Sequence, residues 1–333
     1  MEELEGLTPA ALARLVDGSG RARNVWRSLA AGHDPGLDPS LSRSVKARLG
    51  ETVRRVTLTE DGNVVAGCGT AKLRFALHDG QRIETVVIPS ETRSTVCVST
   101  QVGCARGCTF CVTATMGLER GLSAGEIVGQ VLAGRAWARA RAFPPVTNVV
   151  YMGMGEPLDN LDAVRRSIEI LCAREALDVG PSHVTLSTVG TSPDAIRETA
   201  GLPVQLAWSL HAVDDALRRR LIPTARFAPA ELRQAFIDRL RPGNDGLFVE
   251  VTLIRDVNDA DHHAYALADF LEPFRDCRVN LLPMNSGRAG LEPTTAERAV
   301  AFRQVVRSRG RFCAIRRPRG ADRSAACGQL AVI

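Results

Sequence analysis

The chain has 333 residues, 45% of them hydrophobic and 24% charged, which is typical of a soluble globular protein with one large domain or two smaller ones. No apolar run approaches the roughly 18 residues that a membrane span needs, and the first thirty residues lack the pattern of a signal peptide. The formal net charge is +5, but only Lys46 and Lys72 among the 42 basic residues are lysines, which excludes an ordinary P-loop enzyme and argues against Schiff-base catalysis.

Residues 1–90 are predicted to form an accessory region of helices followed by β-hairpins. Thr8 provides an N-cap before Pro9, which suits the first position of a helix, and a second helix is predicted over residues 21–31. The rest of this region shows short alternating runs that indicate strands. These runs are broken by two pairs that are typical of hairpin turns: Asp61-Gly62 and Asp79-Gly80.

Residues 91–333 are predicted to form the main domain, in which strands alternate with helices. A capping box of Ser123 and Glu126 marks one helix start, and Ser192-Pro193 marks another. Further helices are predicted over 259–271 and 295–307. Six strands are predicted: 94–100, 147–152, 183–188, 204–210, 247–254 and 277–283. This alternation predicts an α/β fold with a parallel sheet, either a partial barrel or a doubly wound sheet.

The segment 303–323 is rich in arginine and contains a single acidic residue, Asp322. It has two interpretations: a solvated face enriched by a general bias toward arginine, or a surface that contacts the phosphates of a nucleic acid. The arginines concerned are Arg303, Arg307, Arg309, Arg311, Arg316, Arg317, Arg319 and Arg323.

Cysteines carry the clearest chemical signal. Their odd number and the absence of an export signal argue for metal or redox chemistry in the reducing cytoplasm rather than a disulfide scaffold. Three of them form the motif C-x₃-C-x₂-C after a predicted strand, and an iron–sulfur cluster, a zinc site or a chance grouping could account for it. The nine are Cys68, Cys97, Cys104, Cys108, Cys111, Cys172, Cys277, Cys313 and Cys327.

The motif Cys104–x₃–Cys108–x₂–Cys111, with Phe110 before its last cysteine, resembles that of the radical S-adenosylmethionine (SAM) superfamily. The resemblance implies a partial (β/α)₆ barrel and one [4Fe–4S] cluster held by the three cysteines. It also implies that the fourth iron binds SAM, whose reductive cleavage yields a 5′-deoxyadenosyl radical.

Six further motifs occur in the order typical of the RlmN/Cfr family of radical SAM RNA methyltransferases, which the chain resembles from about residue 80 to its C-terminus. They are QVGC at 101–104, MGMGEP at 152–157, VTLST at 184–188, SLHA at 209–212, VNLLPMN at 279–285 and ACGQL at 326–330. Leu158 replaces the third glycine of a Rossmann fingerprint, so the second motif does not indicate dinucleotide binding.

The resemblance implies a set of SAM-binding residues. Taken alone, the motif at 152–157 is a glycine-rich turn with one acid at a strand end, where α/β folds bind ligands. Ser187 and Asn285 alone are ordinary polar residues, and His211 alone is a structural histidine. The positions implied by the family are Gly155, Glu156, Ser187, Ser209, Leu210, His211 and Asn285.

The resemblance also implies three catalytic residues. Cys327 would carry the methyl group as S-methylcysteine, Cys97 would resolve the resulting protein–RNA adduct through a transient Cys97–Cys327 disulfide, and Glu84 would accept a proton. Without the resemblance, Cys327 would be a buried free thiol and Glu84 an acid on a strand surface. The remaining cysteines are interpreted as structural.

The predicted function is C2 methylation of an adenosine in 23S ribosomal RNA, with transfer RNA as a further substrate. The resemblance implies a monomer that takes electrons from a flavodoxin or ferredoxin. The alternatives are C8 methylation of the same adenosine, which gives antibiotic resistance, a radical SAM enzyme with a non-RNA substrate, and a non-enzymatic zinc or iron–sulfur protein that binds nucleic acid. The same cysteines serve C2 and C8 chemistry, so the motifs do not separate them.

Overall fold

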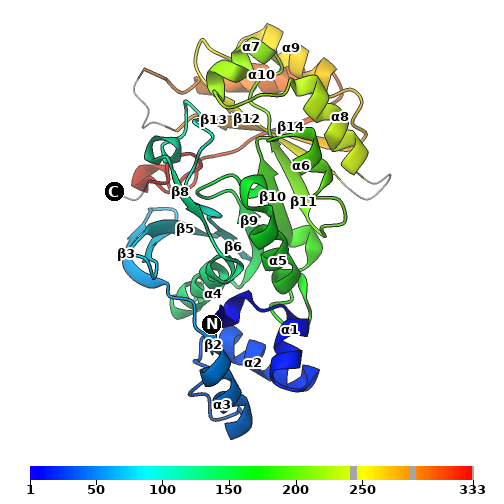
Figure 1. The fold of residues 1–333 in the computed structure, drawn as a ribbon. Helices are drawn as coiled ribbons and strands as arrows, with labels where there is room; N and C mark the ends of the chain where they lie inside the picture. The colour runs from blue at the N-terminus through cyan, green and yellow to red at the C-terminus, as the bar shows by residue number, and fades with distance from the viewer. Residues whose placement is uncertain (241–245, 286–289, 332–333) are drawn as a thin grey trace.

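A computed structural model describes residues 1–240, 246–285 and 290–331. Its main feature is a ten-stranded sheet in the order β14-β13-β12-β11-β10-β9-β6-β5-β4-β3 (Figure 1). The strands from β14 to β6 are parallel. They are β6 (Ser94–Cys97), β9 (Val146–Tyr151), β10 (Val184–Thr188), β11 (Gln205–Ser209), β12 (Leu247–Leu253), β13 (Cys277–Pro283) and β14 (Phe312–Ile315).

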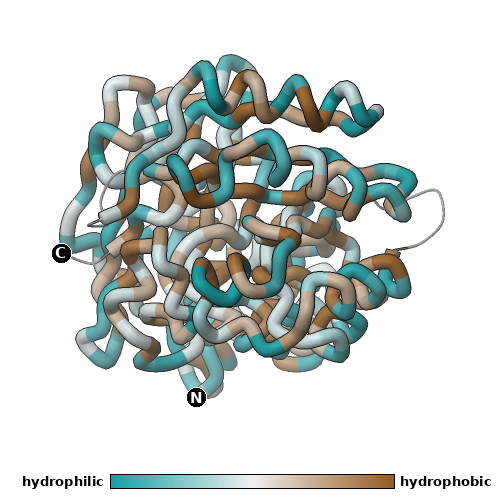
Figure 2. The backbone as a smooth tube through the Cα atoms, turned by 90° about the horizontal axis from the view of Figure 1, so that it is seen from above, coloured by the Kyte–Doolittle hydropathy of each residue, from teal (hydrophilic) through white to brown (hydrophobic). Residues whose placement is uncertain are grey.

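Each crossover between neighbouring parallel strands carries at least one helix, so the sheet contains six β/α units. The predicted α/β partial barrel is therefore confirmed. In Figure 2 hydrophobic and hydrophilic residues alternate along the outer helices, as expected for helices that bury one face. The helices are α4 (Ala124–Ala140), α5 (Leu161–Cys172), α6 (Pro193–Arg197), α7 (Asp215–Leu221), α8 (Pro229–Arg239), α9 (Asp261–Phe270) and α10 (Ala296–Ser308).

Most strand predictions agree with the structure within one residue at each end. The exception is 94–100, because β6 ends at Cys97 and the chain then turns so that the backbone N–H of Thr100 bonds to Met154. The strand β14, four residues flanked by arginines, was not predicted from the sequence. The helices predicted at 259–271 and 295–307 are confirmed as α9 and α10, and Ser123 and Glu126 form the predicted capping box.

The first ninety residues extend both the sheet and the core. Three antiparallel strands continue the parallel sheet at β6, and the buried Trp26 of α2 belongs to the same hydrophobic core as the barrel strands. Thr8 caps the first helix as predicted. The elements are α1 (Pro9–Leu15), α2 (Ser19–Ala31), α3 (Arg43–Thr52), β3 (Thr59–Val65), β4 (Ala71–Ala76) and β5 (Arg82–Pro89).

One of the two predicted hairpin turns is wrong. Asp79-Gly80 does connect β4 to β5, but Asp61-Gly62 lies inside β3, where the pairing with β4 shifts by one residue in a bulge. The bulge turns the Asp61 carboxylate toward two arginines, Arg74 and Arg82, each with a 2.7 Å hydrogen bond. An Asp-Gly pair therefore marks a bulge here rather than a turn, because both features favour the same residues. No helix of the described residues is long and apolar enough to cross a membrane.

Candidate active site

The loop with the three motif cysteines leaves and re-enters a small antiparallel ribbon. It follows β7 (Gln101–Gly103) and leads through a short 3₁₀ turn (Thr113–Met116) into β8 (Leu118–Gly121). The Cys104 N–H donates to the Gly117 carbonyl over 2.7 Å and closes the loop. Gly103 has φ +75°, and a Cβ there would lie 1.9 Å from that carbonyl oxygen, so only glycine fits.

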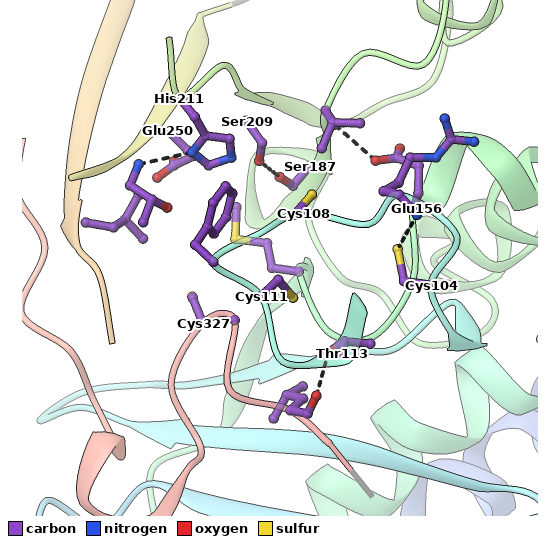
Figure 3. A pocket seen from close by; sticks show the side chains of 18 of the residues that line it. Cys104, Cys108, Cys111, Thr113, Glu156, Ser187, Ser209, His211, Glu250 and Cys327 are labelled. Carbon is purple, nitrogen blue, oxygen red and sulfur yellow. Dashed lines mark hydrogen bonds between the residues drawn. The ribbon is translucent and has the colours of Figure 1, made fainter. Parts of the chain in front are cut away.

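The three cysteines border one cavity, here called the first cavity (Figure 3). Burial raises the pKa of the Cys104 thiol to about 11 and raises that of Cys108 further, since each also faces the other sulfurs of the loop. Such thiols ionise only next to a strong positive charge, such as a bound metal. Three thiols on one loop that border one cavity are a donor set that would fit a [4Fe–4S] cluster, whose ligands are cysteine thiolates.

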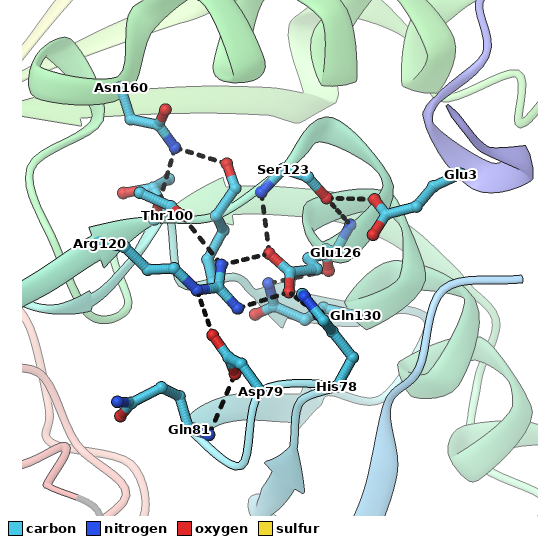
Figure 4. A network of polar contacts seen from close by, with 12 residues as sticks. Glu3, His78, Asp79, Gln81, Thr100, Arg120, Ser123, Glu126, Gln130 and Asn160 are labelled. Carbon is cyan, nitrogen blue, oxygen red and sulfur yellow. Dashed lines mark hydrogen bonds and ion pairs between the residues drawn. The ribbon is translucent and has the colours of Figure 1, made fainter. Parts of the chain in front are cut away.

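A buried polar network fixes the ribbon on which the loop is mounted (Figure 4). Arg120 of β8 donates to both carboxylate oxygens of Glu126 at 2.8 Å, and also to Asp79. Glu126 is 1% exposed and accepts a hydrogen bond from the N–H of Ser123. These hydrogen bonds therefore join the start of α4, the β4–β5 turn and β8.

Removing the Glu126 carboxylate is expected to destabilise the fold and loosen this loop. Glu126→Ala would leave Arg120 partly buried with only Asp79 as a charged partner and would break the capping box. The expected loss is about 2–4 kcal/mol of unfolding free energy, measured by chemical denaturation. Glu175→Ala, at an exposed site, is the matched control, expected to stay within about 0.5 kcal/mol. Equal stability of the two variants would contradict this account.

Gly155 and Glu156 lie on the wall of the first cavity, where the chain leaves β9. Gly155 has φ +102°, and a Cβ there would lie 2.7 Å from the Gln101 side chain, so the turn requires glycine. The Glu156 carboxylate accepts from the N–H groups of Leu158 and Val189, at 3.0 Å each. Burial raises its pKa despite these bonds. The carboxylate is thus held in place and still faces the cavity.

Ser187, Ser209 and His211 also line the first cavity, whereas Leu210 points into the core and is fully buried. The two serine hydroxyls lie 3.2 Å apart on neighbouring strands. His211 adopts φ +62°, and its Nδ1 accepts from the Thr252 N–H over 3.1 Å. Burial and, secondarily, the Arg218 charge lower its pKa to about 3, so the imidazole is neutral. A strained backbone at a cavity wall is typical of a ligand site.

A second cavity adjoins the first, and Cys327 lines both. The second cavity is also lined by Cys97 of β6 and by Asn285, whose side-chain N–H₂ donates to the Cys327 carbonyl over 2.9 Å. Desolvation of the thiol by the surrounding segments and the neighbouring Glu250 raise the pKa of Cys327 to about 11, although the residue as a whole is exposed. Burial and the nearby Cys327 raise the pKa of Cys97. The structure therefore brings together the two cysteines that are 230 positions apart in the sequence.

Five of the eight arginines in the segment 303–323 fall into two groups. Arg307 and Arg311 donate to backbone carbonyls of neighbouring segments and are thus structural. Arg316, Arg317 and Arg319 line the second cavity, beside Cys327, and Arg319 also donates to the Pro89 carbonyl over 2.7 Å. Only this second group is positioned to meet a ligand in that cavity.

Glu84 lies near the second cavity but does not line it. It is 2% exposed on β5, two residues from Val86, which does line that cavity. Its carboxylate pairs with Lys72 at 2.9 Å, and the Ala331 backbone faces it from the C-terminal segment. Burial raises its pKa more than Lys72 lowers it. The C-terminal segment therefore packs directly against the Glu84 carboxylate at the edge of the second cavity.

Comparison with known proteins identifies the family. A model of the radical SAM superfamily matches residues 98–268. The chain is 41% identical over 293 residues to the dual-specificity RNA methyltransferase RlmN of Syntrophotalea carbinolica, which covers 87% of this chain and 77% of that protein. This chain is a radical SAM methyltransferase of the RlmN/Cfr family.

Two further matches agree with this assignment. A probable RNA methyltransferase of Sorangium cellulosum is 46% identical to this chain over 264 residues. These residues make up 79% of this chain but only 66% of that protein. The crystal structure of a radical SAM methyltransferase from Sphaerobacter thermophilus superposes with a TM-score of 0.90 at 37% identity and covers 99% of both chains. The SAM-dependent methyltransferase predicted from the sequence is confirmed.

The structure places two further residues at the methyltransferase site that were not predicted from the sequence. Glu250 lies on β12 and lines both cavities, with Asn280 donating to its carboxylate over 2.7 Å. A single acid in the middle of an apolar strand was a usable signal for Glu250.

Thr113, two residues after Cys111, donates to the Leu330 carbonyl over 2.5 Å, and the Val112 N–H donates to the Gly328 carbonyl. Nothing local indicates these contacts, because they join segments more than 200 positions apart.

Thr113 is expected to hold the segment that carries Cys327 against the cysteine loop. Thr113→Val would leave the buried Leu330 carbonyl without its partner at a cost of about 1–2 kcal/mol. Amide hydrogen exchange of residues 326–331 should accelerate about tenfold in this variant. Thr113→Ser should restore protection, and Thr115→Val, at an exposed position of the same turn, should not alter it. Unchanged exchange in Thr113→Val would refute the tether.

Proposed function

We propose that this methyltransferase adds a methyl group to C2 of an adenosine in 23S ribosomal RNA, and also in transfer RNA. One observation carries the proposal: Cys327 lines both the cavity of the three loop cysteines and the cavity that holds Cys97 and three arginines. A cysteine in that position can receive a methyl group on one side and deliver carbon on the other. The RNA methyltransferases named above support RNA as the substrate class.

In this proposal Cys104, Cys108 and Cys111 hold a [4Fe–4S] cluster in the first cavity. When bound, the cluster supplies the electron that cleaves SAM. Glu156 presents a fixed carboxylate for the SAM ammonium group, and the hydroxyls of Ser187 and Ser209 offer hydrogen bonds. Gly155, Leu210 and His211 contribute backbone and a neutral ring, and Asn285 connects SAM to Cys327 through its bond to the Cys327 carbonyl.

The second cavity is proposed to receive the target base. Arg316, Arg317 and Arg319 supply positive charge for the adjacent phosphates, while residues such as Phe248 provide an apolar wall. A base reaches such a cavity only when it leaves its stack, which favours an adenosine in a loop or a flexible junction. Residues 1–90 are proposed to extend this RNA contact as an accessory region attached to the core of residues 91–333.

The chemistry requires a carrier because adenine C2 is electron-poor and does not attack a methyl cation. Cys327 accepts the methyl group of one SAM by displacement. A radical derived from a second SAM would then remove one hydrogen from this S-methyl group, and the resulting carbon would bond to C2. Cys97 attacks the Cys327 sulfur and breaks its bond to the transferred carbon, which takes up a proton and becomes the methyl group of the base. The Cys97–Cys327 disulfide that forms is reopened in a reducing cytoplasm. Glu84 accepts the C2 proton. The protein is proposed to act as a monomer and to receive electrons from a flavodoxin or ferredoxin.

Nucleoside mass spectrometry tests the proposed reaction. Ribosomal and transfer RNA are digested from a strain that lacks this chain and from the same strain complemented with it. We expect 2-methyladenosine to disappear from both RNA classes in the deletion strain and to return on complementation. Loss of 8-methyladenosine instead would assign the reaction to C8, and no change in either nucleoside would contradict RNA adenosine as the substrate.

A further inference from the structure

The Lys72–Glu84 ion pair stands out because the chain avoids lysine. Only Lys46 and Lys72 among 42 basic residues are lysines, yet Lys72 is the residue that meets the buried Glu84, with Nζ 2.9 Å from Oε1. The lysine side chain is itself 12% exposed. In a chain that uses arginine almost everywhere, an arginine would have matched the charge. The geometry of the pair shows what a lysine does differently.

Lys72 engages one oxygen of the Glu84 carboxylate and leaves the other without a partner. Oε2 is buried and accepts no hydrogen bond of ordinary geometry from the described residues, although the Ala331 backbone lies close to the carboxylate. An arginine guanidinium is a planar fork that favours both oxygens of a carboxylate at once, whereas an ammonium is a compact point donor. A buried acceptor without a partner is costly in a folded protein, which points to a functional reason for it.

The neighbouring arginine is kept away from Glu84. Arg74 lies directly opposite Glu84 in the β4–β5 register, but its guanidinium donates to the side chain and carbonyl of Asp61, at 2.7 and 2.9 Å. The bulge in β3 thus diverts the cross-strand arginine and leaves Glu84 to the lysine. The groups that face the carboxylate are then Lys72 and Arg74 from β4 and the Ala331 backbone from the C-terminal segment.

We propose that Lys72 is the positioning residue of Glu84: it holds Oε1 and leaves Oε2 as the atom that accepts the substrate proton. The inference rests on the proposed role of Glu84. In the step concerned, the C2–H bond of the Cys327–adenine adduct breaks, the proton passes to Oε2, and the bonding pair restores the aromatic ring, while the one unpaired electron left by radical addition would return to the oxidised [4Fe–4S] cluster of the proposed function. Glu84 becomes a neutral carboxylic acid.

The test compares Lys72→Arg with the same change at the other lysine, Lys46→Arg. In Lys72→Arg the guanidinium should hydrogen-bond to both carboxylate oxygens of Glu84, so that neither is free to accept the proton. RNA methylation should then fall at least tenfold, and the covalent Cys327–RNA adduct should accumulate. S-methylation of Cys327, measured by mass spectrometry before RNA is added, should stay within twofold of the parent protein. The thermal midpoint of unfolding should equal that of the parent protein. Lys46→Arg should match the parent protein in every measurement.

A second variant tests the positive charge of Lys72 through the pH dependence of the reaction. Lys72→Met removes the positive charge that lowers the pKa of Glu84, so that pKa rises. Because Glu84 acts as a base only when ionised, the acid limb of the pH–rate profile for adduct breakdown should move to higher pH.

Three outcomes would overturn the inference. Full RNA methylation by Lys72→Arg would exclude the single-oxygen arrangement, and equal loss of Cys327 S-methylation and RNA methylation would assign Lys72 a merely structural role. An unmoved pH profile in Lys72→Met would exclude the charge effect. A fully active Glu84→Gln variant would instead remove Glu84 itself from the proposed mechanism, which distinguishes that failure from the others.

Discussion

Replacing Cys327 by alanine is expected to abolish RNA methylation and leave the fold intact. Cys327 lines both cavities, and the contacts that hold its segment involve backbone carbonyls, including its own, so alanine preserves them. Since the residue is exposed, the unfolding free energy should change by no more than about 0.5 kcal/mol. Methylation should fall on the order of 10³-fold or more, the scale typical of removing a covalent nucleophile.

The control for this variant is Cys68→Ala, at the other exposed cysteine, which should methylate RNA normally. A further measurement separates the carrier role from SAM binding. With dithionite as reductant, Cys327→Ala should still release 5′-deoxyadenosine, because the three loop cysteines and Glu156 remain in place. A Cys327→Ala protein that methylates RNA at the parent rate would refute the carrier role. Loss of SAM cleavage in parallel would show that Cys327 supports the first cavity instead.

Replacing Cys97 by alanine is expected to trap the protein–RNA adduct. Cys97 and Cys327 line the second cavity together, and no other cysteine lines it. Without Cys97 the bond between Cys327 and the base forms but is not resolved, so a covalent complex should appear on a denaturing gel after one turnover. The matched control is Cys277→Ala, a buried cysteine that lines neither cavity, which should give no adduct.

The same step predicts a pH dependence. Burial raises the pKa of Cys97, so only a small fraction is thiolate at neutral pH. Since the thiolate is the attacking species, resolution of the adduct in the parent protein should accelerate about tenfold per pH unit through the neutral and mildly alkaline range. A rate that falls with rising pH, or a Cys97→Ala protein that completes many turnovers, would contradict the resolving role.

The sequence was sufficient where the chemistry is local. The three loop cysteines lie within eight residues, and Gly155 and Glu156 follow directly after a strand, so periodicity and spacing place them on the correct edge of the sheet. The strands β9 to β13 were predicted because each is a buried apolar run between helices. Even the capping box of Ser123 and Glu126 was visible, since both of its bonds join residues three apart.

The remainder depends on contacts between distant segments, for which a single sequence contains no pattern. The bond from Thr113 to Leu330 spans 217 positions, and the shared cavity of Cys97 and Cys327 spans 230. The Asp61-Gly62 pair was misassigned because a bulge and a turn favour the same residues. Composition alone could not divide the arginine-rich stretch, because the role of each arginine depends on its distant neighbours: Arg311 donates to the loop before β13, whereas Arg316 lines the second cavity.

The most direct test of the account follows one methyl group. The protein is incubated with SAM that carries a deuterated methyl group, freed of SAM, and then given RNA, a reductant and unlabelled SAM for a single turnover. The account predicts that the methyl group on the RNA contains deuterium, because its carbon comes from Cys327. An RNA product that carries only unlabelled methyl groups, while the label remains on Cys327, would contradict the central claim.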